Sequence, residues 1–151
     1  MKIEETERIG QIWFEDMWST PNLNVADDII DANYDPSWIQ IDKKGAAQVK
    51  HEITYFRSVF PDLIYKVVEI KGEEDKVWVR YSAKGTHKGE SWGFKPTDKP
   101  VEFEGATILY FNSKGKVIDR WGAFSFYDIL EDLGLVPPLA ELHKHLSNFK
   151  K

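Results

Sequence analysis

The spacing of apolar residues changes once along this chain, near residue 63, and this change constrains the fold more than any other feature. Before it, apolar side chains recur at helical spacing in residues 2–18 and 49–60, and a short segment that Asn24 can cap has the same pattern. After it, four segments rich in Val, Ile and aromatic residues have the character of strands: residues 63–70, 76–84, 101–111 and 116–126. The sequence therefore predicts helices first and a sheet second.

Short polar links join these predicted strands at residues 72–75 and 112–115, and such links favour antiparallel hairpins over parallel crossovers. Helices followed by antiparallel strands indicate an α+β fold, with the helices on one face of a strongly curved sheet that encloses a cavity. Residues 34–41 are expected to be extended, and leucines after residue 128 predict a short helix and a closing helix. The 151 residues contain no repeat or linker, so a single domain over residues 1–151 is expected.

Composition excludes several classes of function. The chain has no cysteine, which excludes disulfides, cysteine-ligated metals and thiol nucleophiles. Its 25 acidic and 20 basic residues give a net charge of -5, which opposes binding to a phosphate backbone, so no nucleic-acid partner is expected. Acidic residues interrupt the apolar positions near the N-terminus, so neither a signal peptide nor a membrane span is predicted. We expect a cytoplasmic protein with no membrane partner.

The strand at residues 76–83 alternates, so it places Trp78, Arg80 and Ser82 on one face. An indole, a guanidinium and a hydroxyl together suit the wall of an amphiphilic pocket. The alternative is that Arg80 forms an ion pair with a carboxylate on a neighbouring strand, such as Asp119 or Glu104, which is common and weak at surfaces.

His87 follows a predicted strand, at a place where loops often carry function, and its imidazole is suited to acid–base catalysis. The alternative is a loop histidine that bonds a backbone carbonyl and rigidifies the turn. The other three histidines, His51, His143 and His145, are expected on the exterior. No histidine has the spacing to a second ligand that a metal site needs, so no metal is predicted.

Asp119 and Asp128 lie on or beside the last predicted strand, among aromatic residues, and a carboxyl there is suited to act as a general acid or base. The alternative for Asp128 is that it caps the helix that follows it.

Several of these residues form a pattern that resembles a known family. The stretch Gly85-Thr86-His87-Lys88-Gly89, followed by Gly93, Pro96-Thr97-Asp98, Val101, Phe103 and Gly105, is similar to the signature loop and strand of SnoaL-like polyketide cyclases, also called ester cyclases. Phe60-Pro61-Asp62-Leu63 upstream, and the segment from Gly115 through Trp121 to Leu133-Gly134 downstream, add to this resemblance. It spans roughly residues 25–135.

The resemblance implies a nuclear transport factor 2-like cone with a ligand cavity, assembled as a homodimer or homotetramer. It also implies ring closure by acid–base chemistry without metal or organic cofactor, driven by an aspartate on the last strand. That position is Gly122 here, and Ser125 stands where the family often has an acidic residue, while His87 matches the family histidine. The resemblance thus supports His87 as a pocket residue and questions the aspartate mechanism.

These observations lead to one leading function and two alternatives. We expect binding of a small apolar or aromatic carbonyl compound, with cyclase- or isomerase-like proton transfer in which His87 is the acid or base and Arg80 or Ser125 polarises an oxygen. Asp128 or Asp119 would replace the missing aspartate if its side chain points inward. The residues expected to contact the ligand are Trp13, Trp38, Trp78, Trp92, Tyr110, Trp121, Phe124 and Ser125. The alternatives are a binding or sensing module without catalysis, and a sheet face that serves as a subunit interface.

Overall fold

The order of helices and strands agrees with the sequence prediction in the computed structural model, which describes residues 1–146. The helices come first and the four strands follow. The elements are α1 (Ile3–Ile12), the π-helix η1 (Trp13–Met17), α2 (Val25–Ile29), α3 (Ala46–Val59), β1 (Ile64–Gly72), β2 (Lys76–Thr86), β3 (Pro100–Phe111), β4 (Val117–Phe124), α4 (Phe126–Asp132) and the 3-10 helix η2 (Leu139–His145).

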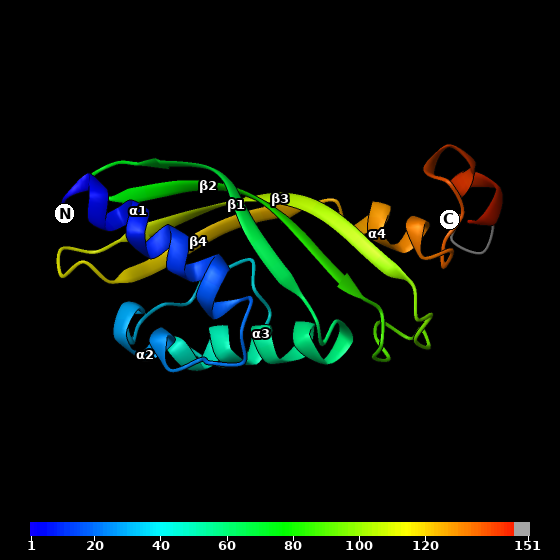
Figure 1. Cartoon of the computed structure of the whole chain (residues 1–151), viewed down its shortest axis with the longest axis horizontal. Coiled ribbons are helices and arrows are strands. Elements are labelled where there is room, and N and C mark those ends of the chain that lie inside the picture. Colours follow the sequence, from blue (N-terminus) through cyan, green and yellow to red (C-terminus); the bar gives the residue numbers. More distant parts are fainter. Residues whose placement is uncertain (147–151) are drawn as a thin grey trace.

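The strands form one sheet in the order β1-β2-β3-β4, and each neighbouring pair is antiparallel, as the short links predict. The register shifts between Val67 and Glu69 in β1 and between Tyr110 and Phe111 in β3. Such irregularities increase the local twist of a sheet. The curled sheet lies over α1, α2 and α3, which all cover the same face (Figure 1). The predicted α+β arrangement is therefore confirmed.

Alternation along the strands decides which side chains face the helices. In β2 the residues Val77, Val79, Tyr81 and Ala83 are buried against the helical layer. The intervening residues, among them Trp78 and Arg80, lie on the opposite, exposed face of the sheet. We call these two sides the inner and the outer face.

Helix α1 approaches the sheet closely at Gly10, where a Cβ atom would come within 3.0 Å of the side chains of Ile70 and Val79. The chain then continues without a break into η1, where the Trp18 amide donates to the Trp13 carbonyl at 3.1 Å, a bond that spans five residues. This wider turn buries Trp13, Phe14 and Met17 together, so the end of the first helical segment carries some of the largest side chains of the core.

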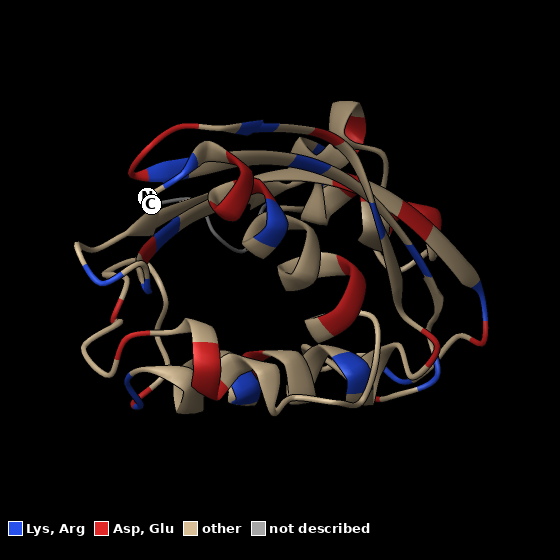
Figure 2. Cartoon of the chain, turned by 60° about the vertical axis from the view of Figure 1, so that its left-hand side comes forward, with Lys and Arg blue, Asp and Glu red and all other residues tan. Residues whose placement is uncertain are grey.

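Charged residues of both signs are interspersed over the helices and the sheet (Figure 2). None of the helices in residues 1–146 has both the length and the apolar character needed to cross a membrane.

Two sequence predictions need correction. The extended segment expected at residues 34–41 is wrong: these residues form a loop with a turn, in which the Ile39 amide donates to the Pro36 carbonyl. Within residues 1–146 no strand pairs with this loop, and the isolated bridge that the preceding segment makes to β4 joins Ile30 to Val117. The closing helix exists as the 3-10 helix η2, whose Leu139 remains 63% exposed because it does not pack on the core.

Candidate functional site

A hollow of about 120 Å³ lies between the inner face of the sheet and the helices, and we call it the inner hollow. Every layer of the fold contributes to it: the first helical segment, the loop before α3, α3 itself, and all strands. It is lined by Phe14, Trp18, Trp38, Glu52, Phe56, Tyr65, Tyr81, Thr107, Arg120, Gly122, Ala123 and Phe124. Most of these side chains are aromatic, and among them Glu52 and Arg120 carry charge.

Glu52 and Arg120 form a buried ion pair at the hollow. One terminal nitrogen of Arg120 donates to both carboxylate oxygens of Glu52, at 2.7 and 2.9 Å. The side chains are 6% and 16% exposed for Arg120 and Glu52 respectively. The guanidinium also lies 5.6 Å from the ring centre of Trp13 and 5.3 Å from that of Trp38. Burial disfavours its charge, but the nearby Glu52 carboxylate outweighs burial and raises the pKa of Arg120.

This ion pair leaves hydrogen-bonding capacity unused. The Nε atom of Arg120 is buried and has no partner among the described residues, and the same is true of the hydroxyl of Tyr34 nearby. Two buried polar groups beside the inner hollow, the Arg120 Nε and the Tyr34 hydroxyl, thus have donor capacity to spare.

Three residues that carry hydroxyl groups also line the inner hollow: Tyr65, Tyr81 and Thr107. Gly105 makes room for one of them, because a Cβ atom at that position would overlap the hydroxyl of Tyr81. Burial raises the pKa of Tyr81 to about 12 and raises that of Tyr65 as well. Both phenols are therefore neutral donors at physiological pH.

Gly122 points into the inner hollow from β4. A Cβ atom there would lie 3.1 Å from the Thr107 hydroxyl oxygen and 3.8 Å from the ring of Trp38. The position that the family resemblance associates with a catalytic aspartate thus does face the hollow, but it supplies no side chain here.

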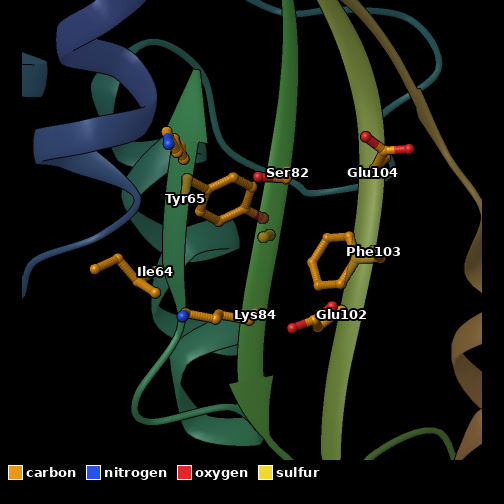
Figure 3. A pocket seen from close by; sticks show the side chains of 9 residues that line it. Ile64, Tyr65, Ser82, Lys84, Glu102, Phe103 and Glu104 are labelled. Atoms are coloured by element: carbon orange, nitrogen blue, oxygen red, sulfur yellow. The ribbon is translucent and has the colours of Figure 1, made fainter. Parts of the chain in front are cut away.

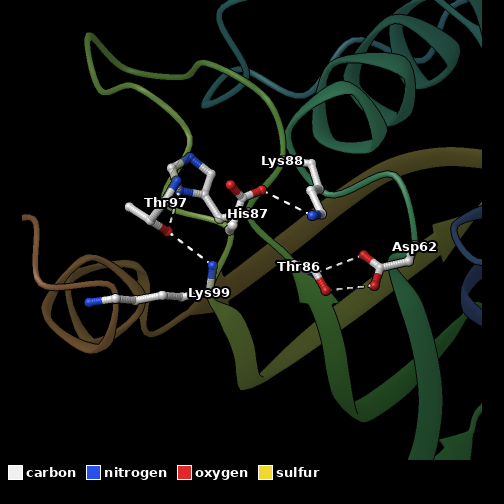
Figure 4. A network of polar contacts seen from close by, with 7 residues as sticks. Asp62, Thr86, His87, Lys88, Thr97 and Lys99 are labelled. Carbon is white, nitrogen blue, oxygen red and sulfur yellow. Dashed lines mark hydrogen bonds and ion pairs between the residues drawn. The ribbon is translucent and has the colours of Figure 1, made fainter.

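The structure places His87 in the connection between β2 and β3, where it is 1% exposed and does not border the inner hollow. The backbone amide of Thr97 donates to its Nδ1 at 3.2 Å, so Nδ1 is an acceptor and the ring proton belongs on Nε2, which faces the Ser91 hydroxyl at 3.3 Å. Figure 4 shows the contact between His87 and Thr97, together with the Asp62–Thr86 contact beside it. Both ring nitrogens hold the loop, as the structural alternative for His87 proposes, although the backbone partner is an amide rather than a carbonyl.

Four predicted site residues lie on the outer face of the sheet: Arg80, Trp78, Tyr110 and Trp121. Arg80 pairs with Glu69 at 2.9 Å and with Glu104 at 3.3 Å, so the ion-pair alternative is confirmed for Glu104. Asp119, the other carboxylate considered, instead accepts a hydrogen bond from the Arg120 amide. Arg80 lies on the outer face and His87 in the buried connection between β2 and β3, so the two are not brought together at one site.

The remaining predicted residues lie in or near the hollow, or at the start of α4. Trp38 and Phe124 line it, while Trp13 is buried behind Arg120. Trp92 packs against Phe56, a lining residue, with ring centres 6.1 Å apart.

Ser125 is the N-terminal cap residue of α4, and Asp128 follows in the first turn. Both are exposed, and no side-chain capping hydrogen bond is formed at this helix end. Asp128 is therefore not the cap, although a carboxylate in the first turn suits the helix dipole.

A larger hollow of about 740 Å³ lies elsewhere, as a trough on the outer face of β1, β2 and β3. Ile64, Lys84 and Glu102 cross it in one row (Figure 3). Ile64 is 50% exposed, and no buried charged group borders the trough. The inner hollow is the better candidate site because it combines enclosure, aromatic walls and a buried ion pair.

Local sequence pattern does not mark Glu52 and Arg120 as partners, since α3 and β4 are far apart in the chain. A weaker signal exists in α3, where Gln48, Glu52 and Phe56 share one side of the helix at four-residue spacing. That side adjoins the buried Val49 and Ile53, so it can be recognised as facing inward.

Comparison with known proteins supports this fold. The pattern of the family described as SnoaL-like polyketide cyclase matches residues 10–133. A comparison with curated proteins gives no match. Among solved structures, TsrD from Streptomyces laurentii superimposes with a TM-score of 0.81 at 14% identity, covering 90% of this chain and 99% of that chain. AclR from Streptomyces galilaeus, a putative hydroxylase, gives 0.75 at 23% identity, covering 98% and 92%.

A putative polyketide cyclase from Acidithiobacillus ferrooxidans gives a TM-score of 0.73 at 23% identity, covering 89% of this chain and 98% of that chain. A protein from Catenulispora acidiphila, described as having a ketosteroid isomerase-like fold, gives 0.66 at 17% identity, covering 85% and 93%. These likenesses establish the fold, and the family match extends over most of the chain. This chain therefore belongs to the SnoaL-like polyketide cyclase family and has its ketosteroid isomerase-like, or nuclear transport factor 2-like, fold.

Proposed function

We propose that this protein binds a small, mainly aromatic carbonyl compound in the inner hollow and transfers a proton on it without a cofactor. The observation that carries the proposal is the buried Glu52–Arg120 pair, which faces a ring-lined hollow. Aromatic walls favour a flat apolar molecule, while the neighbouring hydroxyls and guanidinium favour one with a carbonyl oxygen. Because the two charges of the pair cancel, a neutral ligand fits better than an ionic one.

The chemistry follows from the groups present. Glu52 is the carboxylate among the lining residues, so it is the candidate base for a C–H bond next to the carbonyl. When that bond breaks, the proton passes to Glu52 and the electron pair moves to the carbonyl oxygen, forming an enolate. The neutral phenols of Tyr65 and Tyr81 are candidate donors to this oxygen. Return of the proton from Glu52 to carbon regenerates both partners.

This proposal reassigns the acid–base role. His87, Arg80 and Asp128 all lie outside the inner hollow, and Gly122 lacks a carboxylate. Glu52 on α3 reaches the hollow from the side opposite β4, so it supplies the carboxylate that the last strand does not.

Hydrogen exchange at carbon tests the proposal. Acetophenone in D₂O, followed by NMR, should bind and exchange its methyl protons faster than in buffer. Glu52→Gln should abolish the acceleration, whereas Glu104→Gln on the outer face should leave it unchanged. Binding without accelerated exchange would instead indicate a binding module, and absence of binding would refute the proposal.

We also propose that a second copy of the chain covers the outer face. Trp78 and Trp121 flank Ile108 in one row across three strands, and the two indoles are 47% and 48% exposed. The same face carries both Lys84 and Glu102, so it can pair with itself across a two-fold axis. Light scattering should give the mass of a homodimer or larger assembly, and Trp78→Glu should reduce it. A monomer at all concentrations would refute this proposal.

A further inference from the structure

A hollow of about 300 Å³ adjoins the inner hollow and is distinct from the trough on the outer face of the sheet; we call it the outer groove. It lies between the loop at residues 38–41 and helix α3. Its lining residues are Trp38, Ile39, Gln40, Ile41, His51, Glu52, Tyr55 and Phe56. Trp38, Glu52 and Phe56 line both hollows, so the two are neighbours at the candidate base.

The size of the inner hollow limits what it can hold. A protein cavity of about 150 Å³ accommodates one benzene molecule. The inner hollow, at about 120 Å³, therefore has room for at most a single ring. A ligand with two or more rings must extend beyond it, and the outer groove is the adjoining space.

Trp38 lines both the inner hollow and the outer groove. Its Nε1 donates to the backbone carbonyl of Arg120 at 2.5 Å, and its ring lies 5.3 Å from the Arg120 guanidinium. The indole is nevertheless 47% exposed, because its remaining surface faces away from the core. It is thus held in place by the site while still offering a free aromatic surface to a ligand.

The rest of the outer groove is suited to an apolar group. Ile39 and Ile41 are half-buried along the loop, and Tyr55 on α3 is 39% exposed. His51 adds an exposed imidazole that can hydrogen-bond an oxygen substituent.

We propose that the outer groove is a second ligand subsite, which binds the distal ring of a compound with at least two rings whose carbonyl end occupies the inner hollow. This inference rests on the proposed function, since it assumes that the inner hollow binds the carbonyl end. Ile39 and Ile41 then determine how well the distal ring binds, and they take no part in the proton transfer.

Two probes separate the subsites: acetophenone, with one ring, and 4-acetylbiphenyl, which carries a second ring on the same carbonyl compound. Isothermal titration calorimetry should show 4-acetylbiphenyl binding at least about tenfold more tightly, because the second ring is removed from water. Ile41→Asp should weaken binding of 4-acetylbiphenyl about tenfold and leave that of acetophenone unchanged. The matched control is Ile64→Asp, the same change on the outer face of the sheet, which should affect neither probe.

Tyr55→Ala, on the other wall of the outer groove, is a second variant in case Ile41→Asp impairs folding, which circular dichroism would reveal. If acetophenone binds but 4-acetylbiphenyl binds no more tightly, or if both groove variants weaken the two probes equally, the subsite is refuted while the proposed function stands. If acetophenone itself does not bind, the proposed function fails, and the subsite fails with it.

Discussion

Removing one partner of the buried ion pair should destabilise the fold strongly. In Glu52→Ala the guanidinium of Arg120 would lose both of its hydrogen bonds to the carboxylate, at 2.7 and 2.9 Å. Its Nε already lacks a partner among the described residues, so the charge would be left with its contacts to the Trp13 and Trp38 rings. Breaking such a buried pair costs roughly 3–5 kcal/mol of unfolding free energy. That is a large part of the roughly 5–15 kcal/mol available to a domain.

The exposed pair on the outer face provides the matched comparison. Arg80 and Glu104 are 45% and 68% exposed and lie 3.3 Å apart, so Glu104→Ala should cost only about 0–1 kcal/mol. Urea unfolding followed by circular dichroism measures both values, and an unchanged slope with denaturant would show that the two variants unfold in the same way.

The double variant Glu52→Leu/Arg120→Met tests the physical reason. When both charges are replaced by apolar groups of similar size, no buried charge is left uncompensated, so stability should return to the wild-type value or exceed it. A loss of unfolding free energy in Glu52→Ala no larger than that in Glu104→Ala would refute this reasoning. A double variant as unstable as Glu52→Ala would refute it too, because the loss would then not come from leaving the Arg120 charge unpaired.

Three further predictions concern the site and its loop. Gly122→Asp would place a carboxylate beside the Thr107 hydroxyl and should increase the rate of proton exchange on acetophenone. The control for size is Gly122→Ala. Equal exchange rates in the two variants would argue that an aspartate at this position cannot act as a base in this site. Because burial raises the pKa of Tyr81 from 10.0 to about 12, the unfolded chain loses this proton first, so stability should fall as the pH rises through that window. Tyr81→Phe should reduce this loss by about 3 kcal/mol in alkaline urea titrations, and an unchanged slope would contradict the assignment. His87→Ala should accelerate hydrogen exchange of the Thr97 amide without weakening acetophenone binding. Weaker binding would show instead that His87 contributes to the ligand site.

The sequence by itself determined the architecture. The change from helical spacing to strand alternation near residue 63 requires helices and a sheet, and the short links at residues 72–75 and 112–115 allow only antiparallel neighbours. The segment at residues 34–41 was not determined in this way, because a strand depends on pairing with a neighbouring strand for its hydrogen bonds, and none within residues 1–146 pairs with this loop.

The site was decided by the tertiary structure. Alternation in β2 separates two faces, but both carry aromatic residues, so the pattern does not say which face the helices cover; packing turns Tyr81 inward and leaves Trp78 outside. Likewise, Glu52 on a helix and Arg120 on the last strand are charged residues of types that are rarely buried, and no local sequence pattern marks them as partners. Only the curl of the sheet over α3 brings them within hydrogen-bonding distance, where each makes the burial of the other tolerable.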